Sequence, residues 1–322
     1  MKIDSLEIKY VPIRQGFGEG LLEAGEKDSH VVALCADLTD STKISLFKEK
    51  FPERFFEVGI TEQNMSGVAS GMAAMGKIPF MASYAMFSPG RNWEQIRTTI
   101  TYNDVNVKIV GAHAGVSVGP DGGTHQAIED IALMRVLPKM TVVVPCDAIE
   151  AKKATLAIAE TRGASYIRLG REKTAIITND ATPFVLGKAY IIFDSEIRND
   201  EKKVGIIACG TLVYQAILAA QKLEEEGYEV AVLNLHTIKP FDSEAVLSFA
   251  KRFGKIVTAE EHQVAGGMGS AVAEFSAQNY PVPMRFIGIQ DKYGQSGTQD
   301  ELFKHYKLTA GDIVKAAKEL YF

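Results

Sequence analysis

The sequence is poor in cysteine, has no long apolar run and carries no excess of positive charge. Its 322 residues include three widely separated cysteines, Cys35, Cys146 and Cys209. That spacing excludes a disulfide framework and a cysteine zinc site, and we expect each thiol to be buried. No apolar run approaches the roughly 18 residues of a membrane span, and the N-terminus lacks the apolar core of a signal peptide. We therefore expect a cytoplasmic protein that does not bind membranes.

The balance of charge argues against a nucleic-acid partner. Thirty-five Lys and Arg against 40 Asp and Glu give a net charge of −5, whereas a nucleic-acid binder presents a basic face to the phosphate backbone. Apolar residues make up 46% of the chain and charged residues 23%, as in ordinary globular proteins. At roughly 100–200 residues per domain, the length indicates two compact domains.

Short apolar runs alternate with helical periods from one end of the chain to the other. The runs are continuous rather than alternating in polarity, which is typical of strands covered on both faces. The expected strands are 30–35, 107–112, 141–144, 165–169, 204–208, 229–233, 255–258 and 284–287. The expected helices are 64–75, 126–137, 148–160, 212–226, 243–253 and 309–320, the last with Thr309 as its cap. This alternation predicts an α/β fold of two three-layer domains with largely parallel sheets.

The pattern lapses at residues 172–203. Polar turn residues flank a short apolar piece at 184–193, and a new strand–helix register begins at Val204. We therefore predict a first domain over residues 1–180, a linker over 181–203 and a second domain over 204–322.

Four loops in the first domain carry residues suited to chemistry. They span residues 36–42, 59–64, 84–89 and 113–125, and ligands in such sheets bind beyond the carboxyl ends of the strands. Glu62 suits a helix start with Thr61 as cap, which is its structural explanation. The small residues of the helix after it indicate close packing on both sides, so that the Glu62 carboxylate would be partly desolvated.

His113 and His125 bracket a glycine-rich loop that contains Asp121. Two histidines and one aspartate at this spacing fit no standard metal-ligand pattern. A polyhydroxylated or phosphorylated ligand is the better interpretation. Arg171 follows the strand expected at 165–169 and is placed to project toward the same edge of the sheet.

Two further glycine clusters are interpreted as structural. Gly16, Gly18 and Gly20 follow no predicted strand, so they do not form a dinucleotide-binding turn. The cluster at 266–269 follows a strand and opens a helix, but it lacks the spacing of that motif. It predicts close packing of a helix on a sheet.

Six segments together resemble a known family. GITEQNMSGVASGMAAMG, FSPGR, GPDGGTHQAIED and VPCDAIEA resemble the pyrimidine-binding domain of transketolases, and TIKPFD and TAEEHQVAGGMGS resemble their C-terminal domain. The resemblance covers nearly the whole chain and implies those two domains in that order. Thiamine-diphosphate enzymes bind the diphosphate and Mg²⁺ through a GDG…N motif in a separate domain, and no GDG occurs here. The chain therefore resembles the C-terminal subunit of a split transketolase, with the Mg²⁺ ligands on its partner subunit.

The resemblance also assigns residues. Glu62 matches the glutamate that hydrogen-bonds the aminopyrimidine of thiamine diphosphate, and Glu62 and His125 are expected to be catalytic. The residues matching other cofactor contacts are Asp37, Leu38, Tyr84 and Phe87. Those matching contacts to a sugar phosphate are Arg14, Ser41, His113, Asp121, His125 and Arg171, with Arg168 as the alternative to Arg171. Gly123 departs from the pattern, because the family usually has proline there.

The implied activity is transfer of a two-carbon ketol unit from a ketose phosphate to an aldose phosphate. The implied assembly is an α2β2 heterotetramer, with a homodimer when this chain is alone. Deoxyxylulose-5-phosphate synthases share related motifs, and the β-subunits of 2-oxo-acid dehydrogenases share the split architecture. A binding module without catalysis is the alternative from another class. Arg14, Ser41 and His113 together favour transketolase.

Overall fold

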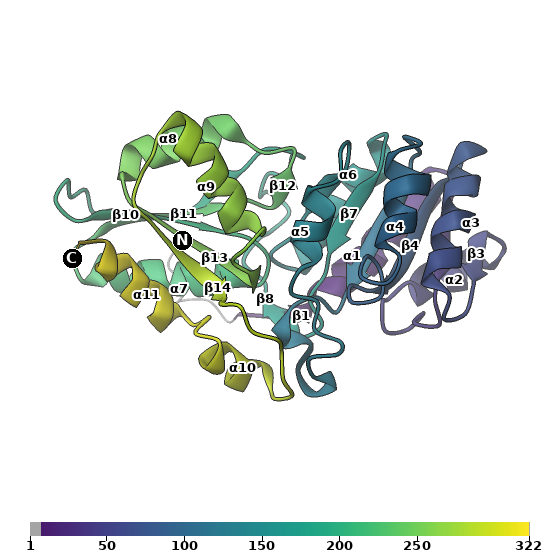
Figure 1. The fold of residues 1–322 in the computed structure, drawn as a ribbon, viewed down its shortest axis with the longest axis horizontal. Helices are drawn as coiled ribbons and strands as arrows, with labels where there is room; N and C mark the ends of the chain where they lie inside the picture. The colour runs from purple at the N-terminus through teal and green to yellow at the C-terminus, as the bar shows by residue number, and fades with distance from the viewer. Residues whose placement is uncertain (1–7, 322) are drawn as a thin grey trace.

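The computed structural model describes residues 8–321, and residues 1–7, where no signal peptide is expected, lie outside that range. Two α/β lobes lie side by side, each built on a largely parallel sheet with helices on both faces (Figure 1). The predicted fold class is confirmed. A short antiparallel pair at the junction, β1 (Tyr10–Pro12) with β8 (Lys173–Ala175), leads into the first helix.

The first sheet has seven strands in the order β12-β6-β7-β5-β4-β2-β3. They are β2 (Val31–Cys35), β3 (Phe55–Glu57), β4 (Ile78–Tyr84), β5 (Lys108–Ala112), β6 (Thr141–Val143), β7 (Ser165–Arg168) and β12 (Thr237–Lys239), and only β12 runs antiparallel to its neighbour. Val31 and Ala33 of β2 pack with α1 (Ile13–Lys27) and α6 (Ala148–Glu160). The alternate residues Val32 and Leu34 pack with α3 (Glu62–Ala74) and α5 (Asp130–Arg135) on the opposite face. This two-sided burial explains why these strands are continuously apolar.

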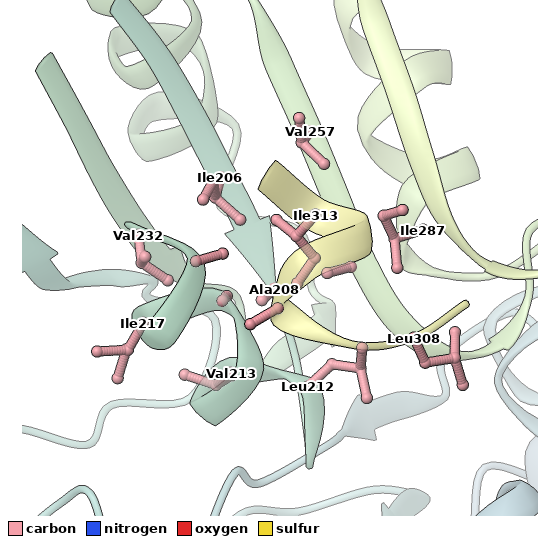
Figure 2. Close-up of a cluster of buried hydrophobic side chains, with 14 of the residues drawn as sticks. Ile206, Ala208, Leu212, Val213, Ile217, Val232, Val257, Ile287, Leu308 and Ile313 are labelled. Atoms are coloured by element: carbon pink, nitrogen blue, oxygen red, sulfur yellow. The ribbon is translucent and has the colours of Figure 1, made fainter. Parts of the chain in front are cut away.

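The second sheet has five strands in the order β14-β13-β10-β11-β9. They are β9 (Tyr190–Asp194), β10 (Lys203–Ala208), β11 (Glu229–Asn234), β13 (Ile256–Gln263) and β14 (Met284–Ile289). Side chains from β10, β11, α7 (Leu212–Glu225) and α11 (Ala310–Lys318) meet on one face, among them Ile206, Val232 and Ile313 (Figure 2). The other face is covered by α8 (Ser243–Phe253) and α9 (Met268–Asn279). Two shorter helices are α2 (Ser45–Lys50) and α10 (Gln299–His305).

The two halves of the chain interlock more than the sequence predicted. Strand β9 lies inside the segment expected to be a linker and pairs with β11, so the second sheet begins before residue 204. Strand β12 belongs to the second half of the chain, yet it pairs with β6 and completes the first sheet. The segment expected to be a linker therefore contributes a strand to the second sheet, and the first sheet is completed by a strand from the second half of the chain.

Several elements differ from the sequence prediction, among them the long helix α1, which was not expected, and two of the differences have a clear cause. The helix expected over 126–137 is helical only at α5, because Ala127 forms an isolated bridge with Ala114 and Gln126 is held by hydrogen bonds to remote carbonyls. The central strand β4 was not predicted. It contains Pro79, which has no backbone N–H to donate to a neighbouring strand. Proline is therefore uncommon in interior strands, and the sequence did not indicate a strand here.

Glycine clusters mark close approaches between elements. Contrary to expectation, strand β1 does precede Gly16, Gly18 and Gly20, but these residues lie inside α1. A Cβ at Gly16 would overlap the carbonyl oxygen of Ala148, the first residue of α6. The packing role predicted for residues 266–269 is confirmed, because a Cβ at Gly269 would lie 2.6 Å from Oγ1 of Thr258 in β13.

In the described part of the chain, helix α3 is packed on one side only. A Cβ at Gly67 or Gly71 would have no atom within 4 Å, and Met75 is 84% exposed. Close packing on both sides is therefore wrong for the chain alone. Thr61 occupies the cap position, but its hydroxyl donates to the Val58 carbonyl instead of capping the helix.

We expect Gly16→Ala to lower the free energy of unfolding by about 1–3 kcal/mol, because the added methyl must displace the α6 backbone. Gly67→Ala is the matched control in α3. Its methyl meets open space, so it should leave stability unchanged or raise it by up to about 1 kcal/mol through helix propensity. Urea unfolding of both variants tests this, and equal effects would contradict the packing role of Gly16.

Candidate functional site

Glu62 is a buried carboxylate at the first turn of α3, with only 1% of its surface exposed. Its Oε2 atom accepts a hydrogen bond from Arg91 Nη1 at 2.7 Å, and its Oε1 lies 3.4 Å from the Ser83 hydroxyl. The side chain of Asn92 donates to the Glu62 carbonyl. Ser83 lies in β4, and Arg91 and Asn92 both lie in the loop that follows it, so β4 and this one loop hold Glu62.

Arg91 is a site residue that the sequence analysis did not assign. Its guanidinium pairs with Glu62 and also lies over the Phe87 ring, 4.7 Å from the ring centroid. The residue stands in the quoted FSPGR segment, which was the available signal. The pairing itself joins residues 29 positions apart, and no spacing in the sequence predicts it.

Aromatic rings connect Glu62's neighbourhood to the glycine-rich loop. Phe87 meets His125 edge-on with centroids 5.4 Å apart, and Tyr84 lies parallel to Phe87 at 6.1 Å. Tyr84 in turn stacks on His113 at 3.9 Å. His113 and His125, predicted to share a site, are thus both in contact with aromatic residues at or just after the end of β4, His113 with Tyr84 and His125 with Phe87.

Arg14 and His113 form a defined hydrogen-bonded pair. Arg14 Nη1 lies 2.7 Å from His113 Nε2, and since a guanidinium can only donate, Nε2 accepts and the imidazole proton is on Nδ1. Burial, followed by the charges of Arg14 and Arg171, lowers the pKa of His113 to about 3. Burial and the Arg171 charge also lower the pKa of Arg14. The imidazole is therefore neutral beside two guanidinium groups.

Two donors in this pair have no protein partner. Within residues 8–321, Arg14 Nε and His113 Nδ1 are buried and without a hydrogen-bond acceptor. Buried donors of this kind are costly unless something satisfies them. They make this end of the site suitable for an acceptor-rich ligand such as an oxyanion or a polyol.

The geometry distinguishes Arg171 from Arg168. Arg168 is 6% exposed, its Nε bonds Asp130 at 2.8 Å, and its Nη2 donates to the carbonyls of Ala127 and Glu261. These bonds leave it as a structural residue of the buried interface between the lobes. Arg171 is half-buried and donates to the Val118 carbonyl at 2.8 Å. Its positive charge helps to lower the pKa of both Arg14 and His113.

The remaining predicted residues lie on nearby loops. Asp37 is exposed, with φ of 57°, and its N–H donates to the carboxylate of Glu57 at 2.7 Å. Leu38 packs partly against the α1 side of the core. The residues described above form one cluster, the Glu62–His113 cluster: Glu62, Arg91, Phe87, Tyr84, His125, His113 and Arg14. Among the described residues, no side-chain hydrogen bond or ring contact joins Asp37, Leu38, Ser41 or Asp121 to this cluster.

Residues 8–321 contain neither a candidate metal site nor a candidate membrane-spanning helix. No group of three or more His, Cys, Asp or Glu is placed to hold a metal ion, and no helix is long and apolar enough to cross a membrane. The three cysteines are free and buried, as predicted.

Comparison with known proteins finds transketolase relatives across the chain. The transketolase pyrimidine binding domain matches residues 9–175, and the transketolase C-terminal domain matches residues 194–313. A Methanocaldococcus jannaschii protein named as a transketolase C-terminal section is 43% identical over 313 residues, which are 96% of each chain. A 6-deoxy-6-sulfo-D-fructose transketolase subunit of Clostridium sp. is 42% identical over 308 residues, 96% of this chain and 94% of the relative. A solved split-gene transketolase, an inactive β4 tetramer, superimposes with a TM-score of 0.87 at 41% identity, covering 97% of this chain and 98% of that one.

The lowered pKa of His113 predicts a pH dependence of stability. The folded value of about 3 lies below the ordinary value of 6.5, so the unfolded chain binds the proton more readily. The contribution of His113 is therefore fully present above about pH 6.5 and is lost as the pH falls toward 3. Relative to His113→Asn, which cannot titrate, the free energy of unfolding of the wild-type protein should fall by about 2.5 kcal/mol between pH 7 and pH 4.5. Parallel pH profiles of the two proteins in urea unfolding would contradict a buried neutral imidazole.

Proposed function

The chain belongs to the transketolase family, and we propose that it is the C-terminal subunit of a thiamine-diphosphate-dependent transketolase. The reaction is transfer of a two-carbon ketol unit from a ketose phosphate to an aldose phosphate. Relatives of the same length that are transketolase sections or subunits favour this over the deoxyxylulose-5-phosphate synthase and 2-oxo-acid dehydrogenase alternatives. An intact set of buried polar side chains at one sheet edge argues against a binding module without catalysis.

The observation that carries the proposal is a continuous row of contacting side chains. At one end stand the Glu62 carboxylate and Arg91, and at the other stand Arg14 and His113. The rings of Phe87 and Tyr84 connect the two ends. A flat heterocycle at the first end and an anionic sugar at the second would lie next to each other, which is the arrangement that ketol transfer needs.

The residues at the first end fit an aminopyrimidine. A buried carboxyl group can hold or release a proton at a ring nitrogen, and Phe87 offers an aromatic surface for stacking. When bound, thiamine diphosphate supplies the carbon nucleophile that carries the two-carbon unit. We assign Glu62 to the pyrimidine ring nitrogen N1′, with Phe87, Tyr84, Leu38 and Asp37 around the ring. Arg91 would neutralise Glu62 before the ring binds.

The residues at the second end fit an anionic sugar. The unpartnered Nε of Arg14 and Nδ1 of His113 can donate to oxygens, and Arg171 adds a second positive charge. We assign the terminal oxyanion of the substrate to Arg14, Arg171 and Ser41, and the sugar hydroxyls to His113, Asp121 and His125. Phosphate and sulfonate share this chemistry, and one relative is named for a sulfonated sugar.

The chain alone offers no diphosphate or Mg²⁺ ligands of the family type, so the proposal includes a partner subunit with a GDG…N motif. The exposed side of α3 is the surface we assign to assembly. Gly67, Gly71, Met72 and Met75 line an apolar hollow there of about 420 Å³. Glycines that face open space permit close approach of another helix, and two copies of each subunit would close the assembly symmetrically.

The proposal is tested by mixing the chain with a GDG…N subunit. The mass in solution, the affinity for Mg²⁺–thiamine diphosphate and ketol transfer are measured for each subunit and for the mixture. Fructose 6-phosphate and 6-deoxy-6-sulfofructose serve as alternative donors, with ribose 5-phosphate as acceptor. We expect tight cofactor binding and turnover only in the mixture. Turnover by this chain alone would refute the split-subunit assignment.

Glu62→Gln should lower kcat of the mixture by about 10²–10⁴-fold, because an amide cannot exchange a proton with N1′. The fold should be retained, since glutamine has nearly the same shape. Glu94→Gln is the control, because Glu94 is an exposed carboxylate close to Arg91 in sequence. Near-normal turnover by Glu62→Gln would remove Glu62 from the catalytic role.

Arg171→Ala should raise KM for anionic sugars at least about tenfold and leave KM for an uncharged analogue nearly unchanged. The reason is that the lost guanidinium–oxyanion contact exists only for the anionic substrate. Lys173→Ala removes a nearby exposed charge and serves as the control. If KM rises equally for both kinds of sugar, Arg171 has a structural role.

A further inference from the structure

The glycines of the loop at residues 113–125 face the C-terminal lobe. A Cβ at Gly123 would lie 2.6 Å from the Gly294 carbonyl oxygen, and one at Gly122 would lie 2.7 Å from the Ser296 hydroxyl. A Cβ at Gly115 would overlap the Glu261 carboxylate, and Gly119 approaches Gly297. The loop is therefore rich in glycine because the second lobe lies against it, with α10 following the contacting segment (Figure 1).

Hydrogen bonds tie the same loop to that lobe. Glu261, at 2% exposure in β13, accepts the Ser117 N–H at 2.6 Å on one carboxylate oxygen and the Thr211 hydroxyl at 2.6 Å on the other. Gln126, directly after His125, donates to the Gln295 carbonyl at 2.9 Å and to the Val116 carbonyl at 3.0 Å. Both ends of the loop are thus held from outside the first lobe.

The conformation of the loop needs such support. Gly115, Gly119 and Gly122 have φ values of 86°, 78° and 77°, and His113 has φ of 53°. Glycine gives these conformations little local preference, so contacts elsewhere must select them. Among residues 8–321, Glu261 is the only residue of the second lobe whose carboxylate accepts a hydrogen bond from an N–H of the loop.

We infer that Glu261 is a positioning residue. It does not touch the substrate itself, but it holds the loop so that His113 and His125 face the substrate. The inference rests on the proposed function for its catalytic consequence. It gives the C-terminal lobe a direct part in substrate binding. It also explains Gly123, since a proline there would collide with the Gly294 backbone.

The neighbouring Glu260 provides a matched control. It is equally buried, and its carboxylate accepts the N–H groups of Met268 and Gly269 at the start of α9. The two glutamates share a strand and a degree of burial, but only Glu261 reaches the loop. A general loss of stability would affect both variants, whereas loss of positioning is specific to Glu261.

The experiment measures amide hydrogen exchange of the full chain over residues 113–126. Glu261→Ala should speed exchange there by about 10- to 100-fold, because a buried bond to a charged acceptor is lost. Glu261→Gln should restore most protection, since its oxygen accepts the Ser117 N–H and its amide can donate to Thr211. Glu260→Ala should leave the loop protected. Gly294→Ala, at a half-buried position, should also speed exchange by displacing the Gln126 side chain, and this variant tests the inference if Glu261→Ala fails to fold.

Activity with the partner subunit gives the second readout. Glu261→Ala should raise KM for the ketose donor at least about tenfold with a smaller change in kcat, and Glu261→Gln should recover it. Unchanged loop exchange in Glu261→Ala and Gly294→Ala, or equal exchange in the Glu260 and Glu261 variants, would overturn the inference. Absence of turnover by the unmodified mixture would instead count against the proposed function, because the exchange readout does not depend on it.

Discussion

Parallel pairing of β2, β4, β5 and β7 is the constraint on which the site depends. Because the four strands run in the same direction, the loops that follow them emerge at one edge of the sheet. The loops carrying Asp37, Arg91, His113 and Arg171 are those four loops. Residues far apart in sequence, such as Phe87 and His125, therefore become neighbours without any local signal. Continuous burial of the strands on both faces fixes this edge, and the chemistry follows from which side chains the loops supply.

Charge is distributed along the site in a way that limits its own cost. Glu62 is buried, but Arg91 compensates it, and Arg91 also lies over Phe87. At the other end, a second guanidinium beside a protonated imidazole would be strongly repulsive. The lowered pKa of His113 keeps that ring neutral, so that it accepts from Arg14 and still offers an N–H. The site thus keeps one carboxylate and one cationic end separated by aromatic rings.

The fold was largely predictable from the sequence because it rests on local periodicity. Residues 148–160 and 243–253 are helices with the expected bounds, and Thr309 caps α11 as predicted. The errors occur where distant contacts decide the structure. Pro79 is accommodated in a central strand, and residues 126–129 are not helical because Gln126 bonds a carbonyl 169 positions away. The candidate residues could be named from motifs, but the partners of Glu62 and Arg168 could not, since both are long-range pairs.

The glycine-rich segments also differ in structure in a way that the sequence did not predict. The loop at 113–125 and helix α3 are both rich in glycine, and the sequence suggested ligand contact for one and close packing on both sides for the other. In the structure, the loop glycines meet the C-terminal lobe, whereas a Cβ at Gly67 or Gly71 would meet no atom of residues 8–321 within 4 Å. The free side of α3 is therefore the surface that we propose for another subunit. The loop, in contrast, is already held by its own chain, so the proposed substrate side of the site would be organised before the proposed partner binds.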